Sequence, residues 1–180
     1  MRILKENTLA IVIDIQERLF PYISENQQLT ENTKRLIEGL KIFEIPIIIS
    51  EQYKKGLGLT ITEISSILPN IEPKEKMAFS CCDDDGIFKT LTSYGKKNII
   101  LCGIESHICV LQTTIDLIDN GFTPIVVADC VSSRSLYNKK IALKRMAKEG
   151  AVITTYESIL FELCRFAGNE QFKAISKLVK

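Results

Sequence analysis

Five short apolar runs, rich in β-branched residues, recur along this 180-residue chain, and the segments between them are long enough for a helix. The runs cover residues 9–13, 46–49, 98–101, 124–127 and 152–154. Runs this short, without regular polar alternation, are typical of strands buried on both faces. Because parallel neighbours need crossover connections, strands separated by helix-length segments predict a parallel sheet.

Between the runs, apolar residues are spaced three and four positions apart, as on one face of a helix. The spacing is seen in Leu29, Leu36, Ile37, Leu40 and Phe43, then in Ile108, Leu111, Ile115 and Ile118, and last in Phe172, Ile175 and Leu178. The order predicts an α/β fold, a three-layer doubly wound (Rossmann-like) parallel sheet with helices on both faces. The length and the lack of a linker or repeat predict a single domain over residues 1–180.

Charge and hydropathy argue against several classes of partner. The 23 basic and 22 acidic side chains nearly balance, so nothing points to nucleic acid or an anionic membrane surface. The first apolar run ends at Asp14 and is too short for a signal sequence or a membrane span. We therefore expect a cytoplasmic protein with no nucleic-acid and no membrane partner.

Six cysteines and one histidine, His107, are present. A chain of this size with a large apolar core does not need disulfides, so we interpret the cysteines as reduced thiols. No CxxC pair occurs, which argues against a zinc knuckle and against a thioredoxin-type motif. We expect no metal and no other cofactor.

Polar and reactive residues follow several of the predicted strands. Asp14 follows the first, residues 50–53 (Ser-Glu-Gln-Tyr) follow the second, residues 103–109 follow the third, and Asp129 with Cys130 follows the fourth. In doubly wound folds, ligands bind beyond the carboxyl ends of the strands. The sequence therefore predicts one crevice to which these groups contribute.

Cys109 lies near the start of the helix predicted after residues 98–101. Unpaired backbone N–H groups and the helix dipole at such a place favour an anion, which predicts a lowered pKa for Cys109 and a nucleophilic thiol. The same N–H groups can bind an oxyanion. The alternative is an inert buried thiol, and position alone does not decide between them.

Asp14 and Lys76 are each ambiguous when taken alone. Asp14 leaves an apolar strand, a desolvating setting that suits an acid–base group, but Glu17 stands at the capping-box spacing and favours a helix cap. Lys76 is a lone base among apolar neighbours, for which a surface lysine is the simpler interpretation. The three aspartates at 83–85 fit the first turn of a helix better than a cation site.

Taken together, these residues carry a resemblance. Asp14 in IVIDIQE, Lys76 in KMAFS and Cys109 in GIESHICVLQT resemble the three catalytic motifs of the isochorismatase-like cysteine hydrolases. The blocks EQYKKGLG at 51–58 and ADCVSSRS at 128–135 resemble the isochorismatase-domain-containing proteins. The resemblance covers nearly the whole chain.

The resemblance implies a reaction on an amide or related C–N bond of a small-molecule substrate. Asp14 would take the proton of Cys109, the thiolate would attack the carbonyl to give a thioester, and Lys76 would hold Asp14 in place. It also implies a cis peptide between Ile104 and Glu105, and an oxyanion hole made by the backbone N–H groups of Glu105 and Cys109. Tyr53 and Phe79 are expected to line the pocket, and core packing is the alternative for Phe79. We expect the variants of the three catalytic residues to fold, because strand and helix ends lie outside the packed core.

Nicotinamidases of this superfamily bind a metal through an aspartate and two or more histidines. This sequence has one histidine, His107, which argues against metal-assisted recognition of nicotinamide. A structural role is favoured for His107. Ser132, Ser133 and Arg134 are expected to tie a loop together. The resemblance further implies a homo-oligomer. A catalytically weak binding module on the same fold is the alternative, and vinyl-ether hydrolysis, as in isochorismatase itself, is disfavoured because it uses no thiol nucleophile.

Overall fold

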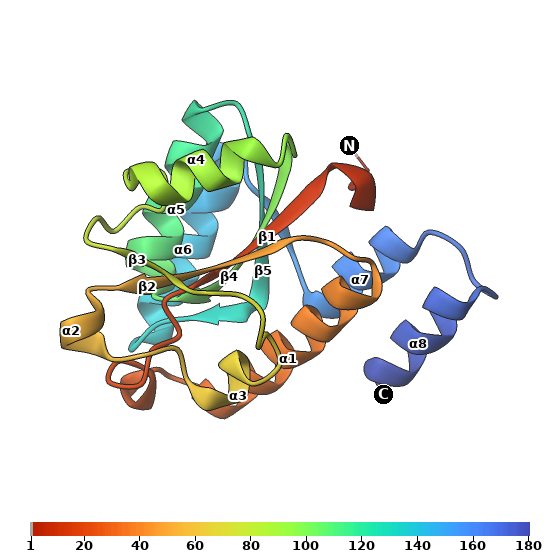
Figure 1. Ribbon diagram of the computed structural model, residues 1–180, viewed down its shortest axis with the longest axis horizontal. Coiled ribbons are helices and arrows are strands. Elements are labelled where there is room, and N and C mark those ends of the chain that lie inside the picture. Colours follow the sequence, from red (N-terminus) through yellow and green to blue (C-terminus); the bar gives the residue numbers. More distant parts are fainter. Residues whose placement is uncertain (1) are drawn as a thin grey trace.

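The computed structural model describes residues 2–180 and contains a six-stranded sheet in the order β3-β2-β1-β4-β5-β6 (Figure 1). The strands are β1 Thr8–Ile13, β2 Ile47–Gln52, β3 Lys74–Lys76, β4 Asn98–Ile104, β5 Thr123–Ser132 and β6 Val152–Thr154. Every neighbouring pair is parallel, which confirms the predicted α/β fold. The strand order changes direction between β1 and β4, the position at which doubly wound sheets open a crevice.

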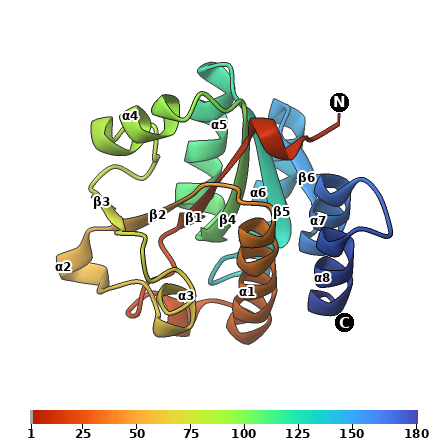
Figure 2. The same ribbon diagram turned by 45° about the vertical axis from the view of Figure 1, so that its right-hand side comes forward.

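Helices cover both faces of the sheet (Figures 1 and 2). One face carries α1 Asn26–Ile42, α3 Thr62–Ser65, α7 Tyr156–Cys164 and α8 Glu170–Leu178, and the other carries α4 Asp85–Ser93, α5 Leu111–Asp119 and α6 Leu136–Glu149. The short segments are η1 Lys5–Asn7, η2 Phe20–Tyr22, α2 Lys54–Leu57 and the π-helix η3 Ser106–Val110. Within residues 2–180, no helix has both the length and the apolar character needed to cross a membrane.

The central strands form because both of their faces are buried in apolar layers. In β1, Ala10 and Val12 belong to the core under α1, whereas Leu9, Ile11 and Ile13 belong to the core under α4, α5 and α6. Side chains alternate between the two faces of a strand, so an uninterrupted apolar run fills two cores at once. This explains why the run at residues 9–13 predicts a strand correctly.

The differences from the prediction lie at the edges of the elements. The sequence analysis missed β3, because Lys74–Lys76 is a short edge strand of charged residues without an apolar pattern. Strand β5 continues to Ser132, so Asp129 and Cys130 lie within it and do not follow it. The aspartates at 83–85 do begin a helix, because Asp84 caps α4 by accepting a hydrogen bond from the backbone N–H of Ile87.

The carboxyl ends of β1 and β4 approach each other closely at Gly103. Its backbone has φ +123°, and a Cβ at this position would lie 2.1 Å from the backbone oxygen of Ile13. Only glycine fits both the conformation and the space. The approach brings the residue after β1, Asp14, next to the segment after β4 that contains Cys109.

Candidate active site

Asp14, Lys76 and Cys109 come together at the carboxyl ends of three strands. Asp14 follows β1, Lys76 is the last residue of β3, and Cys109 lies in η3 after β4. Relative exposure is 1% for Asp14, 1% for Lys76 and 6% for Cys109. Asp14 and Cys109 line the same cavity, and the amine of Lys76 reaches Asp14 from β3. The structure thus brings together three side chains that are up to 95 positions apart in sequence.

Lys76 is fully enclosed by acceptors. Its Nζ donates to Oδ2 of Asp14 at 2.7 Å and to Oε1 of Gln52 at 2.8 Å, and the backbone oxygens of Phe79 and Ala78 lie at 3.0 and 3.3 Å. Burial alone would lower the pKa of Lys76, but the negative charge of Asp14, together with Cys81 and Cys109 where these are ionised, outweighs it and raises the pKa above 10.5. The interpretation of Lys76 as a surface lysine is therefore wrong.

Both carboxylate oxygens of Asp14 have a donor. Ser50 donates from Oγ to Oδ1 at 2.7 Å, while Lys76 donates to Oδ2. Asp14 itself has a left-handed backbone with φ 52°, and no helix begins at it. The helix-cap interpretation of Asp14 is consequently wrong, and its carboxylate is committed to a buried ion pair.

The sequence analysis placed residues 50–53 at the crevice but gave Ser50 and Gln52 no individual role in the site. They lie two positions apart on β2 and contact the two members of the ion pair, Ser50 on Asp14 and Gln52 on Lys76. Polar residues at alternate positions after an apolar run were a signal that could have identified them. The side-chain amide of Gln16 forms two hydrogen bonds with the backbone of Gln52. It accepts from the N–H of Gln52 at 2.7 Å and donates to the backbone oxygen of Gln52 at 3.0 Å.

The lowered pKa expected for Cys109 is wrong. Burial and the adjacent Asp14 carboxylate raise the pKa of Cys109 well above 9.0, and the positive charge of Lys76 offsets only part of this effect. The prediction failed because it counted the start of a helix and omitted both desolvation and the neighbouring anion. In the resting site the Cys109 sulfur is a protonated thiol at neutral pH.

The segment around Glu105 is held by the segment after β5. The peptide bond between Ile104 and Glu105 is cis, as the resemblance implied. The carboxylate of Glu105 accepts hydrogen bonds from the backbone N–H of Arg134 at 2.9 Å and from its Nε at 3.1 and 3.2 Å. His107 forms a 3.0 Å hydrogen bond between Nδ1 and Oγ of Ser133, in agreement with a structural role.

A cavity of about 240 Å³ opens over Cys109. Its lining comprises Asp14, Leu19, Gln52, Leu57, Phe79, Glu105, Ile108, Cys109 and Arg134. Phe79 therefore lies where the sequence analysis expected it, and Arg134 lines the cavity in addition to tying the loop. Tyr53 does not line it, because the residue has a left-handed backbone with φ 38° and its ring lies against Gly56, with 45% of the residue exposed.

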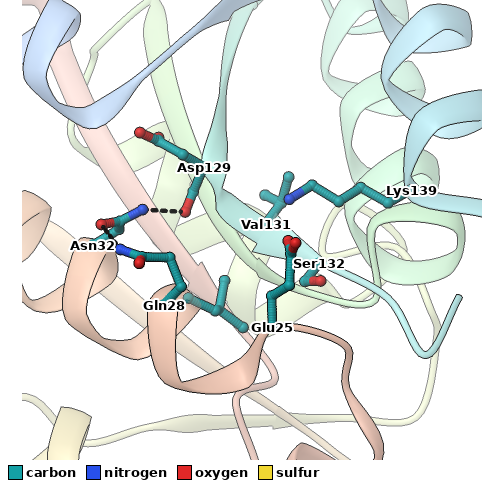
Figure 3. A pocket seen from close by; sticks show the side chains of 8 residues that line it. Glu25, Gln28, Asn32, Asp129, Val131, Ser132 and Lys139 are labelled. Atoms are coloured by element: carbon teal, nitrogen blue, oxygen red, sulfur yellow. Dashed lines mark hydrogen bonds between the residues drawn. The ribbon is translucent and has the colours of Figure 1, made fainter. Parts of the chain in front are cut away.

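A second, smaller space lies on the α1 side of β5 (Figure 3). Its volume is about 70 Å³, and Asn32 closes it by donating to the backbone oxygen of Asp129 at 3.0 Å. The carboxylate of Asp129 accepts from the backbone N–H of Tyr156 at 2.9 Å. The expectation that Asp129 and Cys130 share the crevice with Cys109 is wrong, since Cys130 packs in the core under α1. In the part of the chain described, no three His, Cys, Asp or Glu side chains are grouped to hold a metal ion.

A family model for the isochorismatase domain matches residues 8–158. The chain belongs to the isochorismatase family. The secreted isochorismatase effector Isc1 of Phytophthora sojae is 38% identical over 184 residues, covering 99% of this chain and 87% of that protein. Isochorismatase domain-containing protein 2A of Mus musculus is 36% identical over 180 residues, covering 99% and 85%.

Solved structures share the whole fold of this chain. MAR1 ribonuclease from Caenorhabditis elegans matches with a TM-score of 0.93 at 38% identity, covering 99% of this chain and 92% of that one. The YcaC gene product of Escherichia coli, described as an octameric hydrolase of unknown specificity, matches with a TM-score of 0.93 at 23% identity, covering 99% and 89%, a likeness in fold alone. Membership of the isochorismatase family supports a hydrolase of that superfamily.

Proposed function

We propose that this protein is a cysteine hydrolase that cleaves an amide or related C–N bond of a small molecule through a thioester on Cys109, without a cofactor. The observation that carries the proposal is that Asp14, buried and paired with Lys76, lines one cavity together with the Cys109 thiol. A buried carboxylate next to a thiol is a base within reach of the proton that must leave.

Because the pKa of Cys109 is raised, the first step of the reaction is a proton transfer from its thiol to Asp14. Because the thiol is protonated at rest, its proton passes to Asp14 as the sulfur attacks the carbonyl carbon. The C–S bond forms, the backbone N–H groups of Glu105 and Cys109 stabilise the oxyanion, and Asp14 returns the proton to the leaving nitrogen as the C–N bond breaks. Asp14 then activates water, which releases the acid and restores the thiol. Lys76 keeps Asp14 oriented and compensates its charge throughout.

Two other functions are weighed against this one. A weakly active binding module has no need of a fully hydrogen-bonded Asp14–Lys76 pair next to a thiol, and burying such a pair has an energetic cost. Ribonuclease activity, which the name of the Caenorhabditis elegans relative suggests, would favour a basic surface for the phosphate backbone. The balance of 23 basic and 22 acidic residues supports the small-molecule proposal instead.

Several expectations accompany the proposal. A single domain over residues 1–180, a homo-oligomer and a cytoplasmic location stay predictions. The YcaC gene product is described as octameric and the Phytophthora sojae relative as secreted, and each description belongs to that protein. Gel filtration with light scattering measures the oligomeric state directly.

The proposal is tested by a screen of small amides, ureas and carbamates. We expect Cys109→Ala, Asp14→Asn and Lys76→Ala each to reduce turnover by roughly 10²–10⁴-fold, and double variants to be little worse than Cys109→Ala, because groups that act as a unit are non-additive. Cys82→Ala is the matched control, since Cys82 does not line the cavity. Near-normal turnover by Cys109→Ala would contradict the covalent mechanism. Losses of turnover that add up in the double variants would contradict the proposal that the three residues act together.

A further inference from the structure

Each charged group at the cavity is already paired with a group of opposite sign. Asp14 is paired with Lys76 at 2.7 Å. Glu105, which is 4% exposed, is paired with Arg134 through the Nε of its guanidinium and through its backbone N–H. Counting Lys76, which lies behind Asp14 and does not line the cavity, the two ion pairs are neutral overall, and no buried cation is left over to compensate an anionic substrate.

Apart from Gln52, whose amide is already hydrogen-bonded to Lys76 and to the backbone oxygen of Met77, the remaining wall of the cavity is hydrocarbon. Leu19, Leu57, Phe79 and Ile108 come from four separate segments, and all four line the same space as Cys109. Apolar side chains converging on a concave site favour an apolar ligand group, because burying its surface removes it from water. The hydrocarbon wall and the reactive thiol thus belong to one pocket.

Volume limits the size of that group. About 240 Å³ is below the roughly 300–1,000 Å³ of pockets for drug-sized ligands. An amide together with a short hydrocarbon chain is of this order. A peptide or a nucleotide exceeds this volume and would not be enclosed as a whole.

We propose that the site selects uncharged small amides that carry a short hydrocarbon substituent, with Leu19, Leu57, Phe79 and Ile108 forming the apolar subsite. This inference rests on the proposed hydrolase function and names its substrate class. Arg134 does not alter it, because Nε of Arg134 already donates to both carboxylate oxygens of Glu105 and the side chain is 59% exposed to screening solvent. Bringing a charge into the apolar wall without a partner is costly, so charged analogues are rejected.

The first experiment measures kcat/KM for acetamide, butyramide and hexanamide, with adipamic acid and 6-aminohexanamide as charged counterparts of hexanamide. We expect kcat/KM to rise by about fourfold per added methylene until the cavity is filled, and the two charged amides to fall at least roughly 100-fold below hexanamide. Equal or better turnover of either charged amide, or no dependence on chain length, overturns the proposal.

Leu57 and Leu59 provide a matched pair of variants on one segment. Leu57 lines the cavity, whereas Leu59 is 49% exposed and does not. We expect Leu57→Ala to reduce the advantage of hexanamide over acetamide by roughly tenfold, and Leu59→Ala to leave it unchanged. The same loss in both variants contradicts the subsite.

A second readout separates the subsite from the hydrolase function. N-alkyl iodoacetamides of increasing chain length and iodoacetate label Cys109 without any turnover, and each rate is divided by the rate with glutathione. If longer neutral reagents label Cys109 faster and iodoacetate is disfavoured while no amide is hydrolysed, the subsite stands and the proposed function fails. If amides are hydrolysed but labelling shows no preference for neutral apolar reagents, the subsite fails and the hydrolase function stands.

Discussion

The hydrogen bonds around Asp14 and Lys76 account for how an ion pair can be kept away from water. Removing two charges from water is costly unless the geometry is good and further hydrogen bonds satisfy both groups. Ser50 supplies the second donor to Asp14, and Gln52 with the backbone oxygen of Phe79 supplies further acceptors to Lys76. The pair is therefore fixed before any substrate arrives, which is the condition for electrostatic assistance at a reacting centre.

Removing one member of this pair should destabilise the fold as well as the reaction. Lys76→Ala leaves the carboxylate of Asp14 buried without its cation, so we expect a loss of about 3–5 kcal/mol in the free energy of unfolding, measured in urea. Lys74→Ala, on the same strand and half-buried, should change it by less than ~0.5 kcal/mol. The expectation that such variants fold assumed that Asp14 and Lys76 lie outside the packed core, and the 1% exposure of both residues shows that this assumption is wrong. Equal stability of the two variants would contradict the buried pair.

Gln52 should act on the reaction through Lys76. In Gln52→Leu the amine loses an acceptor that stabilises its protonated form, so the pKa of Lys76 falls and the alkaline limb of the kcat/KM profile moves to lower pH. Gln112→Leu, on the exposed side of α5, is the control. A profile that keeps its shape in Gln52→Leu while only the rate falls would mean that Gln52 acts by packing alone.

Among the elements, β2 organises two regions with alternate residues. Ser50 and Gln52 contact the ion pair, while Glu51 accepts from the backbone N–H of Thr60 at 2.7 Å and from its hydroxyl at 2.8 Å. The strand thereby holds the active-site groups and the segment that contributes Leu57 to the cavity. The alternation of side chains along a strand produces both roles within three positions.

The close approach of β1 and β4 gives a prediction about a single methyl group. Gly103→Ala places a Cβ 2.1 Å from the backbone oxygen of Ile13, so the two strand ends must separate, and we expect more than about 4 kcal/mol of lost stability. Gly95→Ala has the same kind of positive φ, +61°, with no atom within 4 Å, and should lose only about 1–2 kcal/mol. Thermal unfolding of both variants checks this, and equal losses would mean that β1 and β4 are farther apart at this point.

At the scale of the whole molecule, apolar pattern predicts the layers well and the site only in part. Runs such as residues 9–13 identify buried strands, because filling two cores requires continuous apolar sequence. Edge strand β3 has no such pattern, so the burial of Lys76 could not be read from the sequence. Tertiary packing sets the directions of the side chains, and the sequence pattern does not show them. This is why the sequence did not reveal the roles of Ser50, Gln52 and Arg134, or that Tyr53 does not line the cavity.

The buried thiols predict how the whole fold responds to alkaline pH. Burial raises the pKa of Cys102 from 9.0 to about 12 and that of Cys81 to about 11. Above pH 9 the unfolded chain therefore releases thiol protons that the folded protein retains, and stability falls by about 1.4 kcal/mol per thiol for each pH unit up to the folded pKa. Lys76, with its raised pKa, acts in the same direction above about pH 10.4.

Urea unfolding between pH 6 and pH 10.5 measures this response. We expect the free energy of unfolding to be constant below pH 8, where the thiols are protonated in both states, and to decline above pH 9. In Cys102→Ala the slope of this decline should be smaller by about 1.4 kcal/mol per pH unit, the contribution of one thiol proton. Parallel declines in the two proteins would mean that Cys102 ionises as readily in the folded state as in the unfolded one.

The most direct test of the catalytic unit is whether Cys109 carries the acyl group during turnover. p-Nitrophenyl hexanoate is mixed with the protein, the reaction is quenched in acid, and peptides are mapped by mass. The account predicts a burst of about one nitrophenolate per chain with the hexanoyl group on Cys109, no burst in Cys109→Ala, and a slower burst in Asp14→Asn. A hexanoyl group on another residue, or equal hydrolysis by Cys109→Ala, would contradict it.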